Sequence, residues 1–348
     1  MQTVLRQLLD GQSLSRPEAE RAFELVLTGH ANEMQVAAML SLLAVKGITL
    51  DELVGGAAVM RRHVTRVAAP DDSRRPVLDT CGTGGAPKSF NISTAAAIVT
   101  AAAHNTAGPV ERVRVAKHGG RSRTGRGSAE VLALLGVNID APPDLQAACL
   151  DDVGVCFSFA VNHHPAMKFA AGPRKSLGFP TIFNLLGPLT NPAGARRQLL
   201  GVWDGRYAPM MAEALNQLGC DDAMVVHGLD GMDEITTGDQ TFIARVSDGT
   251  VTTRTFDPIA IGIARAHRAQ FAVETPESAA ALIRAIVTPG PAPAIRAARD
   301  IVALNAAAAL IVAGLTDRWE PALALANEAI DSGRASETLA RLSERSRA

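Results

Sequence analysis

The sequence predicts an α/β protein in which a run of helices precedes a mainly parallel β-sheet. Up to about residue 67, apolar residues recur at helical spacing. From Pro76 onward, short β-branched runs alternate with glycine-rich turns and alanine-rich segments, which is typical of βαβ units. The length of 348 residues favours two domains over one.

The N-terminal helices have clear start signals. Three pairs of residues have the spacing of a capping box: Ser15 and Glu18, Asn32 and Gln35, and Thr49 and Glu52. The polar, proline-containing residues 63–76 then predict a linker.

The remainder of the chain predicts strands and a buried helix. The candidate strands are residues 76–80, 112–117, 154–160, 223–227 and 242–246. Residues 295–315 are alanine-rich and predict a core helix, because their charged residues interrupt any membrane span. The charged residues 339–348 are expected to fray.

Composition limits the possible functions. A formal net charge of −1 argues against a surface built as a whole for nucleic acid or anionic lipid, so an anion site must be local. The four cysteines lack the paired spacing of a zinc site and are expected to be reduced thiols. Because the N-terminus has no long apolar region and no segment predicts a membrane span, we expect a cytoplasmic location.

Residues 78–103 combine a strand, a glycine-rich loop and a helix start. Backbone N–H groups in such a loop and at a helix N-terminus favour a phosphate, although a simple tight turn is the alternative. The loop glycines and the donors at the helix start are Gly82, Gly84, Gly85, Asn91, Ser93 and Thr94.

Residues 112–126 form a second strand and glycine-rich loop, which contains six basic residues and no acid. A small polyanionic ligand explains such a loop better than its rival, nucleic acid. The basic residues are Arg112, Arg114, Lys117, Arg121, Arg123 and Arg126.

Two further segments carry candidate ligand-binding side chains. Arg174, in the broken segment 159–192, has the planar donor set that clamps a carboxylate, or it is a surface residue near a helix end. The adjacent acids Asp233 and Glu234 follow a buried strand and suit Mg²⁺, which uses one or two carboxylates together with substrate phosphates. Adjacent acids in a loop are also commonly just solvated.

Four histidines invite a catalytic interpretation: His118, His163, His164 and His227. Histidine more often has a structural hydrogen-bonding role. The spacings predict no Ser/His/Asp or Cys/His arrangement.

In this order, the motifs resemble the anthranilate phosphoribosyltransferase family, from the N-terminal helices to about residue 330. The matching stretches are GTGG (82–85), FNISTAAA (90–97), VAKHG (115–119), GSAEVLALLG (127–136), HPAM (164–167), TIFNLLGPLTNPA (181–193) and MDEIT (232–236). The ordered set is specific where a single motif is weak.

The resemblance implies a small helical domain, residues 1–67 with part of 166–192, hinged to a large α/β domain, residues 76–348, that binds phosphoribosyl pyrophosphate. It implies a homodimer that pairs through the helical domain. It also implies transfer of ribose 5-phosphate from phosphoribosyl pyrophosphate to anthranilate, with release of pyrophosphate, in tryptophan biosynthesis.

The resemblance also assigns roles to residues. His118 and Arg174 are the candidate catalytic residues, with Arg174 facing the acceptor carboxylate and His118 lining its route. The implied ligands of Mg²⁺ are Ser93, Asp233 and Glu234. The implied substrate-binding residues are Gly82, Gly85, Ala86, Ser89, Asn91, Ile92, Ser93, Thr94, Lys117, His118, Gly119, Gly120, Arg121, Ser128 and Arg174.

The sequence departs from the family pattern around these loops. Ala86 replaces an acid, Gly120 replaces an asparagine, the loop before Ser128 is short, and residues 104–114 contain an insertion. The alternatives are therefore a related phosphoribosyltransferase or a pyrimidine nucleoside phosphorylase with another acceptor. A third is a non-catalytic paralogue that binds nucleic acid through residues 112–126.

Overall fold

The N-terminal part of the chain is a helical bundle, as the sequence predicts. The structure is a computed structural model that describes every residue except 70, 86–88, 107, 121–124, 126 and 292. All three predicted capping boxes are present at the starts of helices. The helices of the bundle are α1 (Gln2–Leu9), α2 (Arg16–Leu27), α3 (Glu33–Lys46) and α4 (Leu50–Arg62).

The second part contains one seven-stranded sheet with the order β3-β2-β1-β4-β5-β6-β7. The pairs among β1 to β5 are parallel, and β6 and β7 add antiparallel pairs at one edge. The predicted mainly parallel sheet is therefore confirmed. The strands are β1 (Val77–Gly82), β2 (Arg114–Gly119), β3 (Val155–Phe159), β4 (Arg197–Gly201), β5 (Asp222–Gly228), β6 (Thr241–Ser247) and β7 (Thr250–Phe256).

Two strands are missing from the sequence prediction. Central strand β4 has the sequence RQLLG, too short and too mixed for a β-branched pattern. Edge strand β7 is largely exposed, so it lacks a buried apolar run. The remaining helices are α5 (Ile92–Ala102), α6 (Ser128–Leu134), α7 (Pro143–Asp152), α8 (Ala160–His163), α9 (Lys168–Leu177), α10 (Ile182–Leu186), α11 (Ala208–Gln217), α12 (Pro276–Val287), α13 (Arg296–Ala313), α14 (Trp319–Asp331) and α15 (Arg334–Arg345).

Each face of the sheet belongs to a different hydrophobic core. Leu199 and Met224 join the core formed with α5 and α13, whereas their neighbours Leu200 and Val225 join the core that contains α11 and the N-terminal helices. This alternation follows from the period of two along a strand. The predicted core helix, residues 295–315, is confirmed as α13, which packs on α5 and on the central strands.

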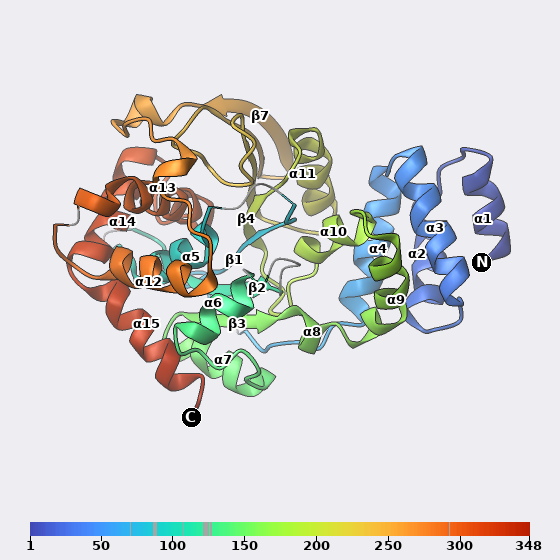
Figure 1. The fold of residues 1–348 in the computed structure, drawn as a ribbon, viewed down its shortest axis with the longest axis horizontal. Coiled ribbons are helices and arrows are strands. Elements are labelled where there is room, and N and C mark those ends of the chain that lie inside the picture. Colours follow the sequence, from blue (N-terminus) through green and yellow to red (C-terminus); the bar gives the residue numbers. More distant parts are fainter. Residues whose placement is uncertain (70, 86–88, 107, 121–124, 126, 292) are drawn as a thin grey trace.

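The bundle includes two helices from much later in the chain. Helix α9 packs on α2 and α3, and α10 packs on α3 and α4. Figure 1 shows α9 and α10 beside α1–α4 at one end of the molecule, with the sheet and its other helices at the opposite end. Segments from before and after the first three strands thus build this helical end together.

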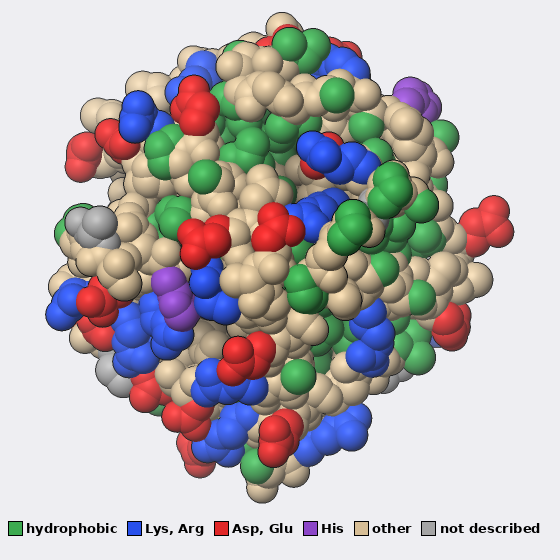
Figure 2. Space-filling model, turned by 90° about the vertical axis from the view of Figure 1, so that its left-hand side faces the viewer, with side chains coloured by type: hydrophobic (Ala, Val, Ile, Leu, Met, Phe, Trp, Pro, Cys, Tyr) green, Lys and Arg blue, Asp and Glu red, His purple; other side chains and the backbone are tan. Residues whose placement is uncertain are grey.

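The charged C-terminal segment does not fray, contrary to expectation. Helix α15 buries Leu339 and Leu342, and Arg345 forms an ion pair with Asp152. Figure 2 shows acidic and basic side chains interspersed over the face remote from the helical bundle. Among the described residues, no helix is long and apolar enough to cross a membrane.

Candidate active site

Several of the predicted site residues lie where two central strands end. Gly82 closes β1 and pairs in register with Gly201, which closes β4. The chain builds β2 and β3 on one side of β1 and then returns to place β4 on its other side. The order of strands therefore reverses between β1 and β4, and ligands of open α/β sheets bind outside the carboxyl ends of strands at such a point.

Residues 229–240, between β5 and β6, carry the acid pair Asp233 and Glu234, and we call them the acidic loop. This loop lies directly on the ends of β1 and β4. A Cβ atom added to Gly201 would be 1.7 Å from the carbonyl oxygen of Asp233, and one added to Gly82 would be 3.3 Å from its Oδ2. Any side chain at position 201 would therefore displace the loop. The sequence motifs include Gly82 but not Gly201, which has no signal apart from ending an unremarkable RQLLG.

Ser93, Lys117 and Glu234 meet beside this loop. The Nζ of Lys117 donates to the Thr80 carbonyl oxygen at 2.7 Å and to the Ser93 hydroxyl at 3.1 Å. The backbone N–H of Ser93 donates to the Glu234 carboxylate. These contacts join β1, β2, the start of α5 and the acidic loop in one cluster.

The charges in this cluster are strongly perturbed. Burial, followed by repulsion from Asp233, raises the pKa of Glu234 to about 8, against the opposing attraction of Lys117. Burial lowers the pKa of Lys117, and the nearby Asp79 carboxylate opposes that shift. Burial also raises the pKa of Asp79 to about 6. Perturbed groups of this kind concentrate at functional sites.

The first glycine-rich loop is attached to the end of β4. The N–H of Thr83 donates to the Gly201 carbonyl oxygen at 2.9 Å, and its hydroxyl accepts from the N–H of Trp203 at 3.1 Å. Gly85 has a φ of +100°, a conformation that side chains rarely adopt, and it lies against Trp203. The predicted residue Ala86 lies outside the described residues.

The residues after this loop place polar groups at the start of α5. Ser89 is buried, and its carbonyl oxygen accepts from the N–H of Val273 at 3.2 Å. Asn91 is the N-cap residue of α5, and Ile92 begins the helix with a buried side chain. The buried hydroxyl of Thr94 has no hydrogen-bond partner among the described residues.

The second glycine-rich turn follows β2. Gly119 ends the strand close to Ser128: a Cβ atom added to Gly119 would be 3.3 Å from the Cβ atom of Ser128. Among the described residues, a Cβ atom added to Gly120 would meet Ala160 alone, at 3.9 Å. The predicted residue Arg121 lies outside the described residues.

Of the described basic side chains of segment 112–126, Arg112 is exposed and the next two are buried. Arg114 and Lys117 are buried, with 2% and 3% of their surfaces exposed. The Nε of Arg114 donates to the Arg75 carbonyl oxygen at 2.7 Å. These two cations therefore face inward and do not offer their charge to nucleic-acid phosphates.

A pair of histidines adjoins the cluster. The Nε2 atoms of His118 and His164 are 3.2 Å apart, and both rings are buried. The backbone N–H of His118 donates to the Asp79 carboxylate at 3.1 Å, which connects this residue to β1. Sequence reasoning treats His164 as structural, and its position in the HPAM motif is the signal that identifies it with the site.

Arg174 belongs to the helical side of the molecule. It lies in the last turn of α9, with its guanidinium carbon 5.4 Å from the centre of the Phe183 ring. Burial lowers the pKa of its guanidinium, which still remains charged. The structure thus groups Gly82, Ser93, Lys117 and the acid pair, and places Arg174 across the boundary on the other unit.

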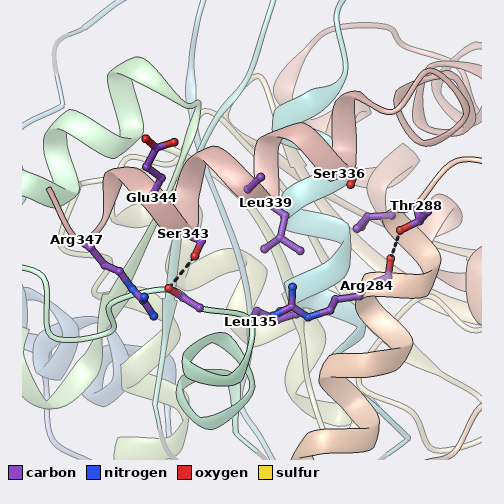
Figure 3. A pocket seen from close by; sticks show the side chains of 11 residues that line it. Leu135, Arg284, Thr288, Ser336, Leu339, Ser343, Glu344 and Arg347 are labelled. Atoms are coloured by element: carbon purple, nitrogen blue, oxygen red, sulfur yellow. Dashed lines mark hydrogen bonds between the residues drawn. The ribbon is translucent and has the colours of Figure 1, made fainter.

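A cavity of about 520 Å³ lies away from these residues, between α12 and α15. Figure 3 shows Arg284, Leu339 and Ser343 around it. None of the predicted site residues that the structure describes lines this cavity. In the described part of the chain, no group of three or more His, Cys, Asp or Glu side chains could hold a metal ion by itself.

The contact between Gly201 and the acidic loop predicts a large effect of a single methyl group. Gly201→Ala should lower the free energy of unfolding by at least about 3 kcal/mol in urea titrations, because the Cβ atom and the Asp233 carbonyl cannot both keep their places. Gly187→Ala is the matched control, since its added Cβ atom would meet no atom of the described residues within 4 Å. Equal stability of the two variants would contradict this packing.

The histidine pair predicts a dependence of stability on pH. Burial, with a smaller contribution from His163, lowers the pKa of His164 to about 4. Between pH 6.5 and 4 the unfolded chain therefore takes up a proton that the folded protein refuses, so the free energy of unfolding falls as the pH falls.

His164→Gln should remove roughly 2–3 kcal/mol of this acid-induced loss in urea titrations from about pH 7 to 4. His30→Gln, at an exposed position, is the control and should follow the wild type. Parallel curves for the wild type and His164→Gln would show that His164 titrates normally in the folded state.

The chain matches two families of domains. Residues 2–64 match the glycosyl transferase family helical bundle domain, and residues 74–336 match the glycosyl transferase family a/b domain. Together these matches cover the two parts described above.

Similar proteins share one name. Anthranilate phosphoribosyltransferase of Moorella thermoacetica is 46% identical, over 97% of this chain and 96% of the relative. The enzyme of Thioalkalivibrio sulfidiphilus is 45% identical, over 98% of this chain and 97% of its own.

Solved structures agree. Anthranilate phosphoribosyltransferase from Thermus thermophilus is 36% identical, with a TM-score of 0.88 over 99% of both chains. The enzyme from Saccharomyces cerevisiae in complex with PRPP and Mg has a TM-score of 0.87 over 99% of this chain and 97% of its own, but at 24% identity it shows the fold alone. The chain therefore belongs to this glycosyl transferase family and, within it, to the anthranilate phosphoribosyltransferases.

Proposed function

We propose that this protein transfers ribose 5-phosphate from phosphoribosyl pyrophosphate to anthranilate and releases pyrophosphate, a step of tryptophan biosynthesis. The observation that carries the proposal is the convergence of two glycine-lined turns and an acidic pair at the ends of β1, β2 and β4. Family membership supports it, because the relatives named above are anthranilate phosphoribosyltransferases.

The turns around β1 and β2 suit the phosphate groups of the donor. The start of α5 places the positive end of the helix dipole beside these turns, which favours an anion. Thr94 has a buried hydroxyl without a partner among the described residues, as expected of a group that awaits a ligand. We assign donor binding to the described residues Gly82, Gly85, Ser89, Asn91, Ile92, Ser93, Thr94, Lys117, Gly119, Gly120 and Ser128.

The acidic pair fits a divalent cation. Burial and the repulsion from Asp233 raise the pKa of Glu234 to about 8, against the attraction of Lys117. Mg²⁺ is a hard cation that takes one or two carboxylates together with substrate phosphates. We assign its protein ligands to Ser93, Asp233 and Glu234; when bound, the ion neutralises charge that develops on the leaving pyrophosphate.

The acceptor side combines Arg174 of the helical unit with two histidines outside it. Arg174 offers a planar fork of donors that matches the carboxylate of anthranilate. The rings of His118 and His164 are neutral at neutral pH, because burial lowers the pKa of both. A neutral, half-apolar lining suits the ring of an aromatic acceptor.

The chemistry demands little acid–base catalysis from the protein. As pyrophosphate leaves, positive charge develops at the anomeric carbon, so fixed donors around the leaving group lower the barrier. The aryl amine of anthranilate is uncharged at neutral pH and offers its lone pair directly. Residues that hold the two substrates in line therefore matter more than a general base.

The proposal extends to the arrangement of the protein. Residues 1–67 with part of 166–192 form one unit, residues 76–348 form the other, and a hinge lets Arg174 approach the donor.

Apolar side chains on α1 and α3 support a homodimer through the helical unit, since Leu9, Met34 and Val45 are 72%, 79% and 89% exposed. A cytoplasmic location is supported by four free cysteines.

The test is the loss of anthranilate fluorescence when protein, Mg²⁺ and phosphoribosyl pyrophosphate are mixed with anthranilate. The wild type should consume anthranilate only with Mg²⁺ present. Arg174→Ala should raise the KM for anthranilate roughly 10- to 100-fold, the equivalent of about 1.5–3 kcal/mol for charge-assisted hydrogen bonds, and leave the KM for the donor within about twofold.

Other outcomes separate the alternatives. No consumption of anthranilate, with transfer to a different acceptor, would point to a related transferase. Phosphate-dependent cleavage of a pyrimidine nucleoside would point to a phosphorylase. Nucleic-acid binding that weakens steeply with salt, in the absence of transfer, would point to the paralogue.

A further inference from the structure

A polar side chain is buried in the middle of the apolar helix α13. Asn305 has none of its surface exposed, and the other buried residues of this helix are Ala, Val, Leu and Ile. Moving an amide from water into such surroundings is unfavourable unless the amide is hydrogen-bonded. The position of Asn305 therefore needs an explanation in terms of its partners.

Those partners lie in the acidic loop. The Oδ1 of Asn305 accepts from the N–H of Ile235 at 3.0 Å, and its Nδ2 donates to the carbonyl oxygen of Ile235 at 2.9 Å. The Nδ2 also donates to the carbonyl oxygen of Ile301, one turn earlier in α13, at 2.9 Å. One amide thus grips both backbone groups of Ile235, as a neighbouring strand would.

Ile235 directly follows the acid pair. We propose that Asn305 is a positioning residue that fixes Asp233 and Glu234 for the divalent cation, an inference that rests on the proposed function. Asp233 is held at its carbonyl by close packing on Gly201, and Ile235 is held two residues later by Asn305. The backbone that carries the two carboxylates is therefore fixed at Asp233 and again at Ile235.

The loop also has internal bonds. The hydroxyl of Thr236 donates to Asp230 at 2.7 Å and accepts from the N–H of Gly238 at 2.9 Å. The N–H of Thr236 donates to the hydroxyl of Thr241 at 3.1 Å. These bonds hold the shape of the loop. Asn305 attaches the loop to α13, the helix that packs on β1 and β4.

Loss of Asn305 should weaken metal binding and leave the binding of anthranilate unchanged. Residues that orient metal ligands typically contribute about 10- to 100-fold to metal affinity or activity. Asn305→Leu keeps the volume and removes all three hydrogen bonds. Asn305→Asp keeps the shape and one acceptor, but it places a buried carboxylate oxygen against the carbonyl oxygens of Ile235 and Ile301, so it should have the larger effect, and Asn305→Leu is the variant that better suits the apolar surroundings.

The first experiment measures the Mg²⁺ activation constant of full-length protein in the fluorescence assay. Asn305→Leu should raise this constant roughly 10- to 100-fold, with the KM for anthranilate changed by less than about twofold. Val302→Ala is the matched control, because Val302 is equally buried in α13 and carries no polar group. An equal rise in Val302→Ala would assign the effect to general destabilisation and overturn the proposal.

The second experiment needs no catalysis. Hydrogen exchange of the backbone N–H of Ile235, measured without metal or substrate, should be about tenfold or more faster in both Asn305 variants than in the wild type or Val302→Ala, because that N–H loses its buried acceptor or its geometry. Calorimetric binding of inorganic pyrophosphate with Mg²⁺ should weaken in parallel.

The outcomes separate the two proposals. A wild type that neither transfers ribose 5-phosphate nor binds magnesium pyrophosphate would overturn the proposed function, and with it this role of Asn305. An active wild type whose Asn305 variants keep both the Mg²⁺ constant and the exchange rate of Ile235 would overturn the positioning role alone.

Discussion

The close approach of the acidic loop to the ends of β1 and β4 is the constraint on which the site depends. Gly82 and Gly201 are paired at the ends of β1 and β4, and neither has a side chain. The backbone of Asp233 therefore packs directly on the ends of these two strands. This contact brings the acid pair to the switch point of the sheet, within reach of the helix start and the buried lysine. Without it, the same residues would be unrelated parts of two loops.

The charges of the cluster require this geometry to be rigid. Lys117 is shared between a carbonyl oxygen of β1 and the hydroxyl of Ser93, so it cannot follow the carboxylates if they move. The repulsion between Asp233 and Glu234 opposes ionisation of Glu234, and under the proposed function a cation held between carboxylates and substrate phosphates relieves that repulsion. The proposed function therefore couples the binding of metal to the binding of diphosphate.

Sequence reasoning predicts the elements whose signals are local. The capping boxes define three N-terminal helices, and glycine-rich turns after β-branched runs identify β1 and β2. It misses β4, because a short run with two leucines gives no period, and β4 is the strand that carries Gly201. It also misses Asn305, since an amide within an alanine-rich helix is taken for core until its partner, 70 positions away in the chain, is known. The departure at Ala86 and the role of Arg121 lie outside the described residues, so they stay sequence predictions.

The central claim is that the turns and the acid pair grip a diphosphate through a divalent ion. The most direct measurement is thermal unfolding of the wild type with phosphoribosyl pyrophosphate, with Mg²⁺, and with both. A ligand at about 100 times its Kd stabilises the folded state by about 2.7 kcal/mol, so both together should raise the Tm by several degrees. Either one alone should raise it far less. An equal rise with the donor alone, or with the double variant Asp233→Asn, Glu234→Gln, would contradict the account.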